Sequence, residues 1–197
     1  MKVVGLTGGI ACGKSKVLYI LGKLGAQFEN ADRIAHEILN RSDVKEHVAR
    51  RFGADMLNEE GNIDRKKLGE LVFADPAKMK IHSDFLIPLI NEKLHTVIKQ
   101  YRESGEGILV VEIPLLFERG LEFLVDTTVV VAADHNTQVE RLCKRDHLTE
   151  EQAMNRIMAQ MPLVEKIKRA DEVIWNNEDY DSLWDKVEQL YNKWLAG

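Results

Sequence analysis

The chain has 197 residues, enough for one well-cored domain with a modest insertion, and its apolar and charged fractions are ordinary for a globular protein. Its 27 Lys and Arg against 32 Asp and Glu give a formal charge of −5, which argues against a nucleic-acid coat or other nucleic-acid partner. The two distant cysteines indicate neither a disulfide framework nor a zinc site, and no apolar run resembles a signal peptide or spans a bilayer, so we expect a cytoplasmic protein with no membrane partner.

The first predicted elements are a strand, a loop and a helix. Residues 3–6 form an apolar run that ends at a glycine-rich turn, and a helical pattern follows as far as residue 24. Residues 27–29 can form a second short strand, and apolar side chains at helical spacing then occupy residues 32–39. Residues 43–104 are mostly helical and amphipathic in pattern. The breaks expected in that stretch lie near Gly53, Gly61 and Pro76.

The second half of the chain alternates strands with helices. Apolar runs at 108–113, 127–133 and 172–175 are typical of parallel strands covered on both faces. Between the last two runs lies a polar, Arg-rich segment in which Thr149 and Gln152 have the spacing of a capping box. A core-facing helical stripe ends the chain, at Leu183, Val187, Leu190 and Trp194. This alternation predicts an α/β fold, a doubly wound parallel sheet of five strands with helices on both faces.

One motif carries most of the functional argument. Residues 8–15 read Gly-Gly-Ile-Ala-Cys-Gly-Lys-Ser and match GxxxxGK followed by Ser or Thr. The glycines let backbone N–H groups point at phosphate oxygens, and the next helix presents its N-terminus to the same anion. Lys14 is expected to reach the β- and γ-phosphates and the Ser15 hydroxyl to coordinate Mg²⁺. The motif predicts ATP and Mg²⁺ as cofactors, bound by Gly8, Gly9, Ile10, Ala11, Cys12, Gly13, Lys14 and Ser15.

Other nucleotide-binding classes fit the sequence less well. A dinucleotide-binding turn would need GxGxxG, which this spacing does not give. The chain lacks the Asn-Lys-x-Asp of guanine recognition and is short for a motor. The motif by itself leaves open a small-molecule or nucleotide kinase and a nucleotide-dependent switch or binding protein.

Further blocks of sequence narrow the choice. They occur in one order along nearly the whole chain, at residues 5–10, 31–32, 34–36, 63–69, 72–73, 114–118, 148–162 and 170–174. Together they resemble the dephospho-CoA kinase family. The resemblance implies ATP-dependent phosphorylation of the ribose 3′-hydroxyl of dephospho-CoA, the last step of coenzyme A synthesis. It also implies a nucleotide-binding core at 1–40 and 106–197, with a mobile lid at about 138–165, and a helical acceptor-binding region at 41–105.

Acceptor-side residues follow from the resemblance. Asp32 is of a type that often caps a helix, and the resemblance favours it as the carboxylate that takes the acceptor proton, so both roles stay open. His36 and Arg65 are further acceptor-side candidates. His36 matches the family pattern, but it can also only pack on its own helix, and we expect no catalytic role for it. The charge run of Arg65, Lys66 and Lys67 is typical of solvated surface, with Arg65 excepted as the candidate for the acceptor pyrophosphate.

Charged residues in the second half of the chain are candidates for the ATP side. The resemblance points to Arg145 and Arg156 of the lid, and less to Arg141, as groups that stabilise charge on the transferred phosphoryl. Taken singly, such arginines are usually solvated helix surface. Glu112 ends an apolar strand, where it can either hold the Mg²⁺ shell through water or reach solvent.

The sequence also departs from the family. Ala11 and Cys12 stand in the loop where the family has Gly and Ser, and we expect Ala11 at negative φ because positive φ is costly for alanine. Cys12 either fills space or has the lowered pKa of a thiol at a helix N-terminus. Ile87 and Asn91 replace a His and an Arg of the family pattern, which keeps another small-metabolite kinase as an alternative. We expect a monomer or small homo-oligomer.

Overall fold

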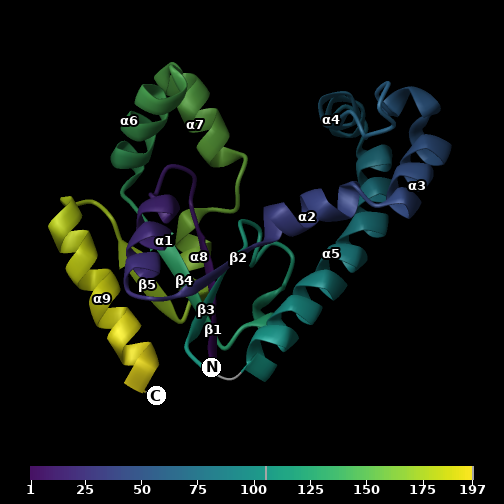
Figure 1. Cartoon of the computed structure of the whole chain (residues 1–197). Coiled ribbons are helices and arrows are strands. Elements are labelled where there is room, and N and C mark those ends of the chain that lie inside the picture. The colour runs from purple at the N-terminus through teal and green to yellow at the C-terminus, as the bar shows by residue number, and fades with distance from the viewer. Residues whose placement is uncertain (105, 197) are drawn as a thin grey trace. The chain divides into compact units, whose positions relative to one another are not determined.

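The computed structural model describes residues 1–104 and 106–196, drawn in Figure 1. It divides into two compact units, the first made of Met1–Asn30 and Gln100–Gly197 and the second of Ala31–Lys99. These boundaries differ from residues 40 and 106 expected from the sequence, because the helix after the second strand groups with unit 2. Within the described ranges no helix has both the length and the apolar character needed to cross a bilayer.

Unit 1 contains a five-stranded parallel sheet, as predicted. Its strands in chain order are β1 (Lys2–Gly8), β2 (Gln27–Asn30), β3 (Ile108–Glu112), β4 (Thr127–Ala132) and β5 (Glu172–Trp175). The order across the sheet is β2-β3-β1-β4-β5, and all neighbours are parallel. The α/β fold class is therefore confirmed. Because β1 is central, its carboxyl end lies between the ends of β3 and β4.

Alternate residues of the strands build the core on one face of the sheet. Val4 and Leu6 of β1 belong to a cluster that also takes apolar residues from β3, β4 and β5. That cluster is closed by α1 (Lys14–Lys23) and α9 (Tyr180–Ala196), which pack on each other. The predicted stripe of α9 is confirmed at its buried positions Leu183, Val187 and Trp194. In the three central strands β1, β3 and β4, the residues that point to the other face, such as Val3, Leu109 and Val130, are also buried, as expected for a sheet covered on both faces.

The segment between β4 and β5 folds into three helices. They are α6 (His135–Asp146), α7 (Glu150–Met158) and α8 (Leu163–Arg169), and a short 3₁₀ turn, η2 (Glu122–Leu124), precedes β4. The capping box is confirmed, because the Thr149 hydroxyl accepts from the Gln152 N–H and the Gln152 amide oxygen accepts from the Thr149 N–H. Helix α8, which packs on β4, was not predicted, because its seven residues are too few for a clear helical period.

Unit 2 is helical, and its breaks fall where the sequence places them. Its elements are α2 (Ala31–Leu39), α3 (Ser42–Phe52), η1 (Ala54–Met56), α4 (Arg65–Phe73) and α5 (Pro76–Ser104), whose last residues belong to unit 1. Gly53 ends α3 with a φ of 116°, which favours glycine, and Pro76 opens α5. The Asp64 carboxylate caps α4 by accepting the Lys67 N–H at 3.0 Å.

Candidate active site

The residues of the GxxxxGK motif line a cavity at the carboxyl end of the sheet. The cavity has a volume of about 470 Å³. Its other walls come from the end of β3, from α6 and from the turn after β5. The residues that line it are Ala11, Gly13, Lys14, Ser15, Lys16, Glu112, Arg141, Lys144, Arg145 and Asn176. Ligands of open parallel sheets bind at this end of the strands, so the cavity is the candidate site.

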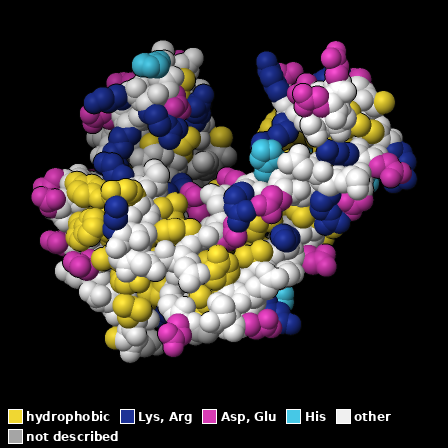
Figure 2. Space-filling view, viewed as in Figure 1, with side chains coloured by type: hydrophobic (Ala, Val, Ile, Leu, Met, Phe, Trp, Pro, Cys, Tyr) yellow, Lys and Arg dark blue, Asp and Glu magenta, His cyan; other side chains and the backbone are white. Residues whose placement is uncertain are grey.

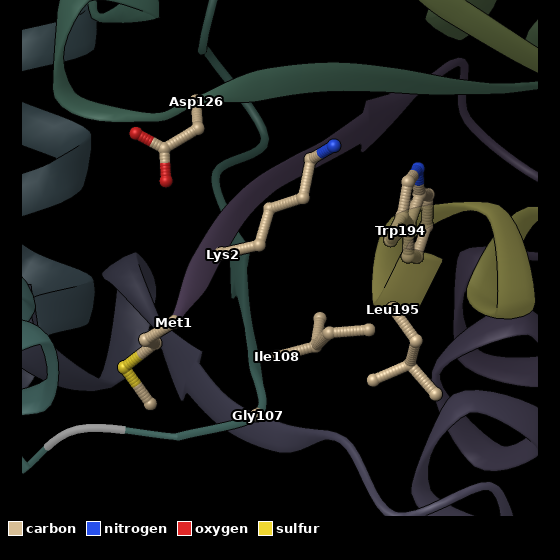
Figure 3. Close-up of a pocket in the computed structure, with 7 residues that line it drawn as sticks. All are labelled: Met1, Lys2, Gly107, Ile108, Asp126, Trp194 and Leu195. Carbon is tan, nitrogen blue, oxygen red and sulfur yellow. The ribbon is translucent and has the colours of Figure 1, made fainter. Parts of the chain in front are cut away.

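A cavity of similar volume, about 510 Å³, lies at the opposite end of β1 and β3. Figure 3 shows Lys2 and Asp126 around it, together with Ile108, Trp194 and Leu195. The Asp126 carboxylate is already engaged, because it accepts the Val3 N–H at 2.8 Å and pairs with Arg102 at 2.5 Å. This cavity lacks both a glycine-rich loop and a helix N-terminus, so it does not compete as the nucleotide site.

The loop leaves several N–H groups without a partner. Among the described residues, the N–H groups of Ala11, Gly13, Lys14 and Ser15 donate no hydrogen bond, whereas that of Ile10 donates to the Gln160 side chain at 3.0 Å. Four donors at the start of a helix form the arrangement that binds phosphate oxygens, as the motif predicts.

The backbone at Ala11 contradicts our expectation. Ala11 has a φ of 59°, in the left-handed region, and not the negative φ that we predicted. Such a conformation costs a non-glycine residue about 1–2 kcal/mol. The loop is therefore strained at Ala11, and other bonds must hold that conformation.

Glycine is required at the end of the loop. Gly13 has a φ of 92°, and a Cβ atom there would lie 2.1 Å from the Asn176 side-chain nitrogen. That nitrogen donates to the Cys12 carbonyl at 2.8 Å. Any side chain at position 13 would displace Asn176 from the loop.

Lys14 lies in a largely desolvated place. Burial lowers the pKa of its ammonium group, while the nearby Glu112 carboxylate acts in the opposite direction. Its Nζ atom lies 3.4 Å from the carbonyl oxygens of Gly8 and Gly9, so the side chain folds back along the loop. An anion bound in the cavity would raise this pKa again and keep the ammonium charged.

Oxygen ligands for a metal ion lie on the same cavity. The Ser15 hydroxyl and the Glu112 carboxylate both line it, and the Asn30 amide donates to Glu112 at 2.7 Å. Hydroxyl, carboxylate and phosphate oxygens suit Mg²⁺, which usually keeps waters and few protein ligands. The described part of the chain holds no cluster of three or more His, Cys, Asp or Glu able to bind a metal without substrate.

The predicted lid arginines differ in their partners. Arg141 donates to the carbonyl oxygens of Ala11 at 3.5 Å and Asn176 at 2.9 Å, so it braces the loop. Arg145 lines the cavity but makes a two-point pair with Asp146, at 2.7 and 3.0 Å, and this pair raises the pKa of Arg145. Arg156 of α7 bonds the same carboxylate at 2.7 Å. Figure 2 shows Lys and Arg side chains on the surface over α6 and α7.

The predicted acceptor-side residues belong to unit 2. Asp32 lies in the first turn of α2, which begins at Ala31, so it does not hold the capping position that we considered. His36 lies one turn further along α2, and Arg65 is the first residue of α4; all three side chains are exposed. The acceptor roles of these three residues stay predictions.

Cys12 is a space-filling residue. Its side chain is fully buried in the core cluster, and burial raises the pKa of its thiol. The lowered pKa that we considered from its place near a helix N-terminus is therefore wrong, because desolvation outweighs the nearby positive charges.

Sequence reasoning missed four residues at this site. Gln138, Gln160 and Asn176 bond the loop, and Asp146 holds the two lid arginines. The sequence gives no periodic or motif signal for the amides, because each acts through a contact more than 120 residues away along the chain. Asp146 could have been found as the acid that follows Arg145 directly.

The chain matches known proteins of one kinase family. The family model described as dephospho-CoA kinase matches residues 2–182. A Bacillus cereus protein named dephospho-CoA kinase is 40% identical over 193 residues, which cover 98% of this chain and 96% of that protein.

A solved structure gives the same assignment. The dephospho-CoA kinase from Campylobacter jejuni superposes with a TM-score of 0.78 at 31% identity, covering 99% of this chain and 98% of that one. Shikimate kinase from Bacteroides thetaiotaomicron, at 17% identity and a TM-score of 0.54, shares the fold alone. The parallel sheet, the phosphate loop at its carboxyl end and the match across residues 2–182 together show that the chain belongs to the dephospho-CoA kinase family.

Proposed function

We propose that the chain transfers the γ-phosphoryl group of ATP to the ribose 3′-hydroxyl of dephospho-CoA and so forms coenzyme A. The observation that carries this proposal is the loop of unpartnered N–H groups beside Lys14, in a chain that matches this kinase family over most of its length. The reaction forms a bond from the 3′-oxygen to the γ-phosphorus, breaks the bond to the β–γ bridging oxygen and releases ADP.

The protein would contribute mainly position and charge. The N–H groups of the loop and the Lys14 ammonium offset the negative charge on the β- and γ-phosphates. Asp32 accepts the proton of the attacking hydroxyl, and His36 and Arg65 bind the acceptor. Arg145 and Arg156 close over the transferred group, with Arg141 behind the loop.

The residues at the cavity also fit Mg²⁺. Ser15 would hold the ion directly and Glu112 through water, since both offer oxygen to the same cavity. When bound, the ion supplies positive charge beside the phosphate oxygens.

The proposal also covers the roles of the two units, the cellular compartment and the oligomeric state. Unit 2 would bind the acceptor, and α6 and α7 would form the lid of the nucleotide-binding core. Both cysteines are free, which fits a reducing compartment such as the cytoplasm. We further propose that the enzyme acts as a monomer or small homo-oligomer, with no nucleic-acid or membrane partner.

An acceptor-dependent ADP assay tests the proposed reaction. Dephospho-CoA should raise ADP release from ATP far above the rate without acceptor, whereas shikimate, adenosine and ribose should not. Asp32→Asn should bind ATP normally and lose on the order of 10²–10⁴-fold in turnover, since it removes the general base. Glu37→Gln on the same helix is the matched control.

Other outcomes would replace the proposal. Stimulation by a different small metabolite would make the chain another kinase of this fold. If no acceptor stimulates ADP release but ATP changes the conformation, the chain is a nucleotide-dependent switch.

A further inference from the structure

Side chains outside the phosphate loop bond three of its carbonyl groups, and that of Ala11 accepts from Arg141 as described above. The Ile10 carbonyl accepts from the Gln138 amide at 2.8 Å, and the Cys12 carbonyl accepts from the Asn176 amide at 2.8 Å. Both amides are buried, with Gln138 3% and Asn176 2% exposed. The Ile10 N–H is bonded as well, to the Gln160 amide oxygen. The Ile10 residue is thus held from both sides by glutamines of α6 and of the α7–α8 connection.

Peptide geometry turns these bonds into a direction for the N–H groups. In a trans peptide the C=O of one residue and the N–H of the next point in opposite directions, and the described chain has no cis peptide. Fixing the Ile10 carbonyl on Gln138 therefore aims the Ala11 N–H the other way. The bond from Asn176 fixes the Cys12 carbonyl and so points the Gly13 N–H away from Asn176. These are two of the N–H groups that lack a partner in the described chain.

We propose that Gln138, Gln160 and Asn176 are positioning residues that hold the loop peptides so that the Ala11 and Gly13 N–H groups face the phosphates of ATP. This inference rests on the proposed function, since it concerns how the same site binds its nucleotide. It also accounts for Ala11, whose left-handed conformation is strained. The hydrogen bonds of the Ile10 N–H to Gln160 and of the Ile10 carbonyl to Gln138 keep Ala11 in that conformation when no nucleotide is bound.

The two glutamines have opposite hydrogen-bonding tasks, which gives a matched test. A carbonyl only accepts, so Gln138 must donate; an N–H only donates, so Gln160 must accept. Glutamate keeps the acceptor and loses the donor. Gln138→Glu and Gln160→Glu therefore add the same charge at the C=O and the N–H of Ile10, and only the second keeps its bond. Because Gln138 is buried and Gln160 is half-buried, the added charge is also less solvated at position 138, and the uncharged Gln138→Met below controls for that difference.

Calorimetric binding of ATP without acceptor is the main measurement. Gln138→Glu should weaken ATP binding by about 10-fold or more, and Gln160→Glu should stay within about threefold of wild type. Equal weakening by both would show an effect of charge alone and would overturn the proposal. Gln189→Leu, on the exposed face of α9, controls for loss of a glutamine.

A rescue experiment separates positioning from general stability. Gln138→Met should weaken ATP binding by about 5–30-fold, the factor that corresponds to positive φ at alanine, and Ala11→Gly added to it should restore most of that loss. The KM for dephospho-CoA should not change. Failure of Ala11→Gly to restore binding in a folded protein would overturn the role of Gln138.

Two further results keep the outcomes distinct. If the Gln138 variants do not fold, Gln160→Leu should weaken ATP binding while Gln160→Glu does not, and equal binding by both would contradict the role of Gln160. If the wild-type chain binds no ATP, the proposed function itself fails. If it binds ATP and the Gln138 variants bind equally well, only the positioning inference fails.

Discussion

In the phosphate loop, the N–H groups of Ala11 and Gly13 have no partner in the described chain, whereas in the lid helices Arg145 and Arg156 share one carboxylate, Asp146. The loop is braced by buried amides, while the lid side chains are more than half exposed, at 57% and 52%. Both regions carry groups suited to phosphate. Under the proposed function, the loop N–H groups would be ready before ATP arrives, whereas Arg145 and Arg156 would first have to leave Asp146, so nucleotide binding and lid closure would be separable steps.

Among the variants that test this difference between the loop and the lid arginines, substitution of Lys14 should lower activity most. Lys14→Met should lower kcat/KM on the order of 10²–10³-fold, because it removes a fixed positive charge from the phosphate site. The unfolding temperature should stay close to wild type, since the lysine has no ion-pair partner in the described chain. Lys23→Met, at the far end of α1, is the control. Near-normal turnover of Lys14→Met would contradict the assignment of the site.

A lid arginine should affect turnover more than binding. Arg145→Met should lower kcat by about 10–100-fold with less than about threefold change in ATP affinity, since its bond to phosphate forms only after closure. Steady-state kinetics together with ATP calorimetry measure the two quantities. Arg119→Met, an exposed arginine of unit 1, controls for loss of charge. A loss confined to ATP affinity would place Arg145 with the loop instead.

Freeing Arg145 and Arg156 from Asp146 should have a smaller effect, and it should raise ATP affinity. Asp146→Asn removes the carboxylate that Arg145 and Arg156 share, and ion pairs between solvent-exposed side chains are weak. ATP affinity should therefore rise slightly in calorimetry, by less than about threefold, within the limit set for Arg145. Weaker ATP binding would show that Asp146 supports the closed lid and does not compete with it.

The smallest expected effect is on stability, and it concerns Asp171, which directly precedes β5; Asn176 directly follows that strand. Asp171 accepts from the Thr128 N–H and hydroxyl, both at 2.7 Å, and these bonds hold the pKa of Asp171 below its usual value. A carboxyl whose pKa is lowered by folding stabilises the fold above its unfolded pKa, about 3.9, and loses that contribution as pH falls through the folded pKa.

Asp171→Asn should therefore lower the free energy of unfolding only slightly at neutral pH, by less than about 1 kcal/mol, because Asp171 is exposed and solvent screens its charge. The difference from wild type should shrink in acid below about pH 4. Denaturant unfolding across that range measures it. A difference that is constant with pH would mean that the charge of Asp171 is not involved.

The sequence predicted the fold more completely than the site. Four of the five strands contain apolar runs, whereas β2 reads Gln-Phe-Glu-Asn and has only a weak strand signal. The GxxxxGK motif lies between the first strand and the first helix, so both local pattern and spacing were informative. Helix α8 was missed, and Ala11 was expected at negative φ. The conformation of Ala11 depends on Gln138 and Gln160, which meet the loop only through the tertiary fold.

The central claim is that the loop presents unpartnered N–H groups to the phosphates of ATP. Titration of the ¹⁵N-labelled chain with MgATP, followed by the amide resonances of residues 10–15, tests it directly. We predict that the Ala11 and Gly13 amide protons move strongly downfield, while the Ile10 amide, held by Gln160, changes little. Unmoved Ala11 and Gly13 resonances in a chain that binds ATP, or a shift confined to Ile10, would contradict the account.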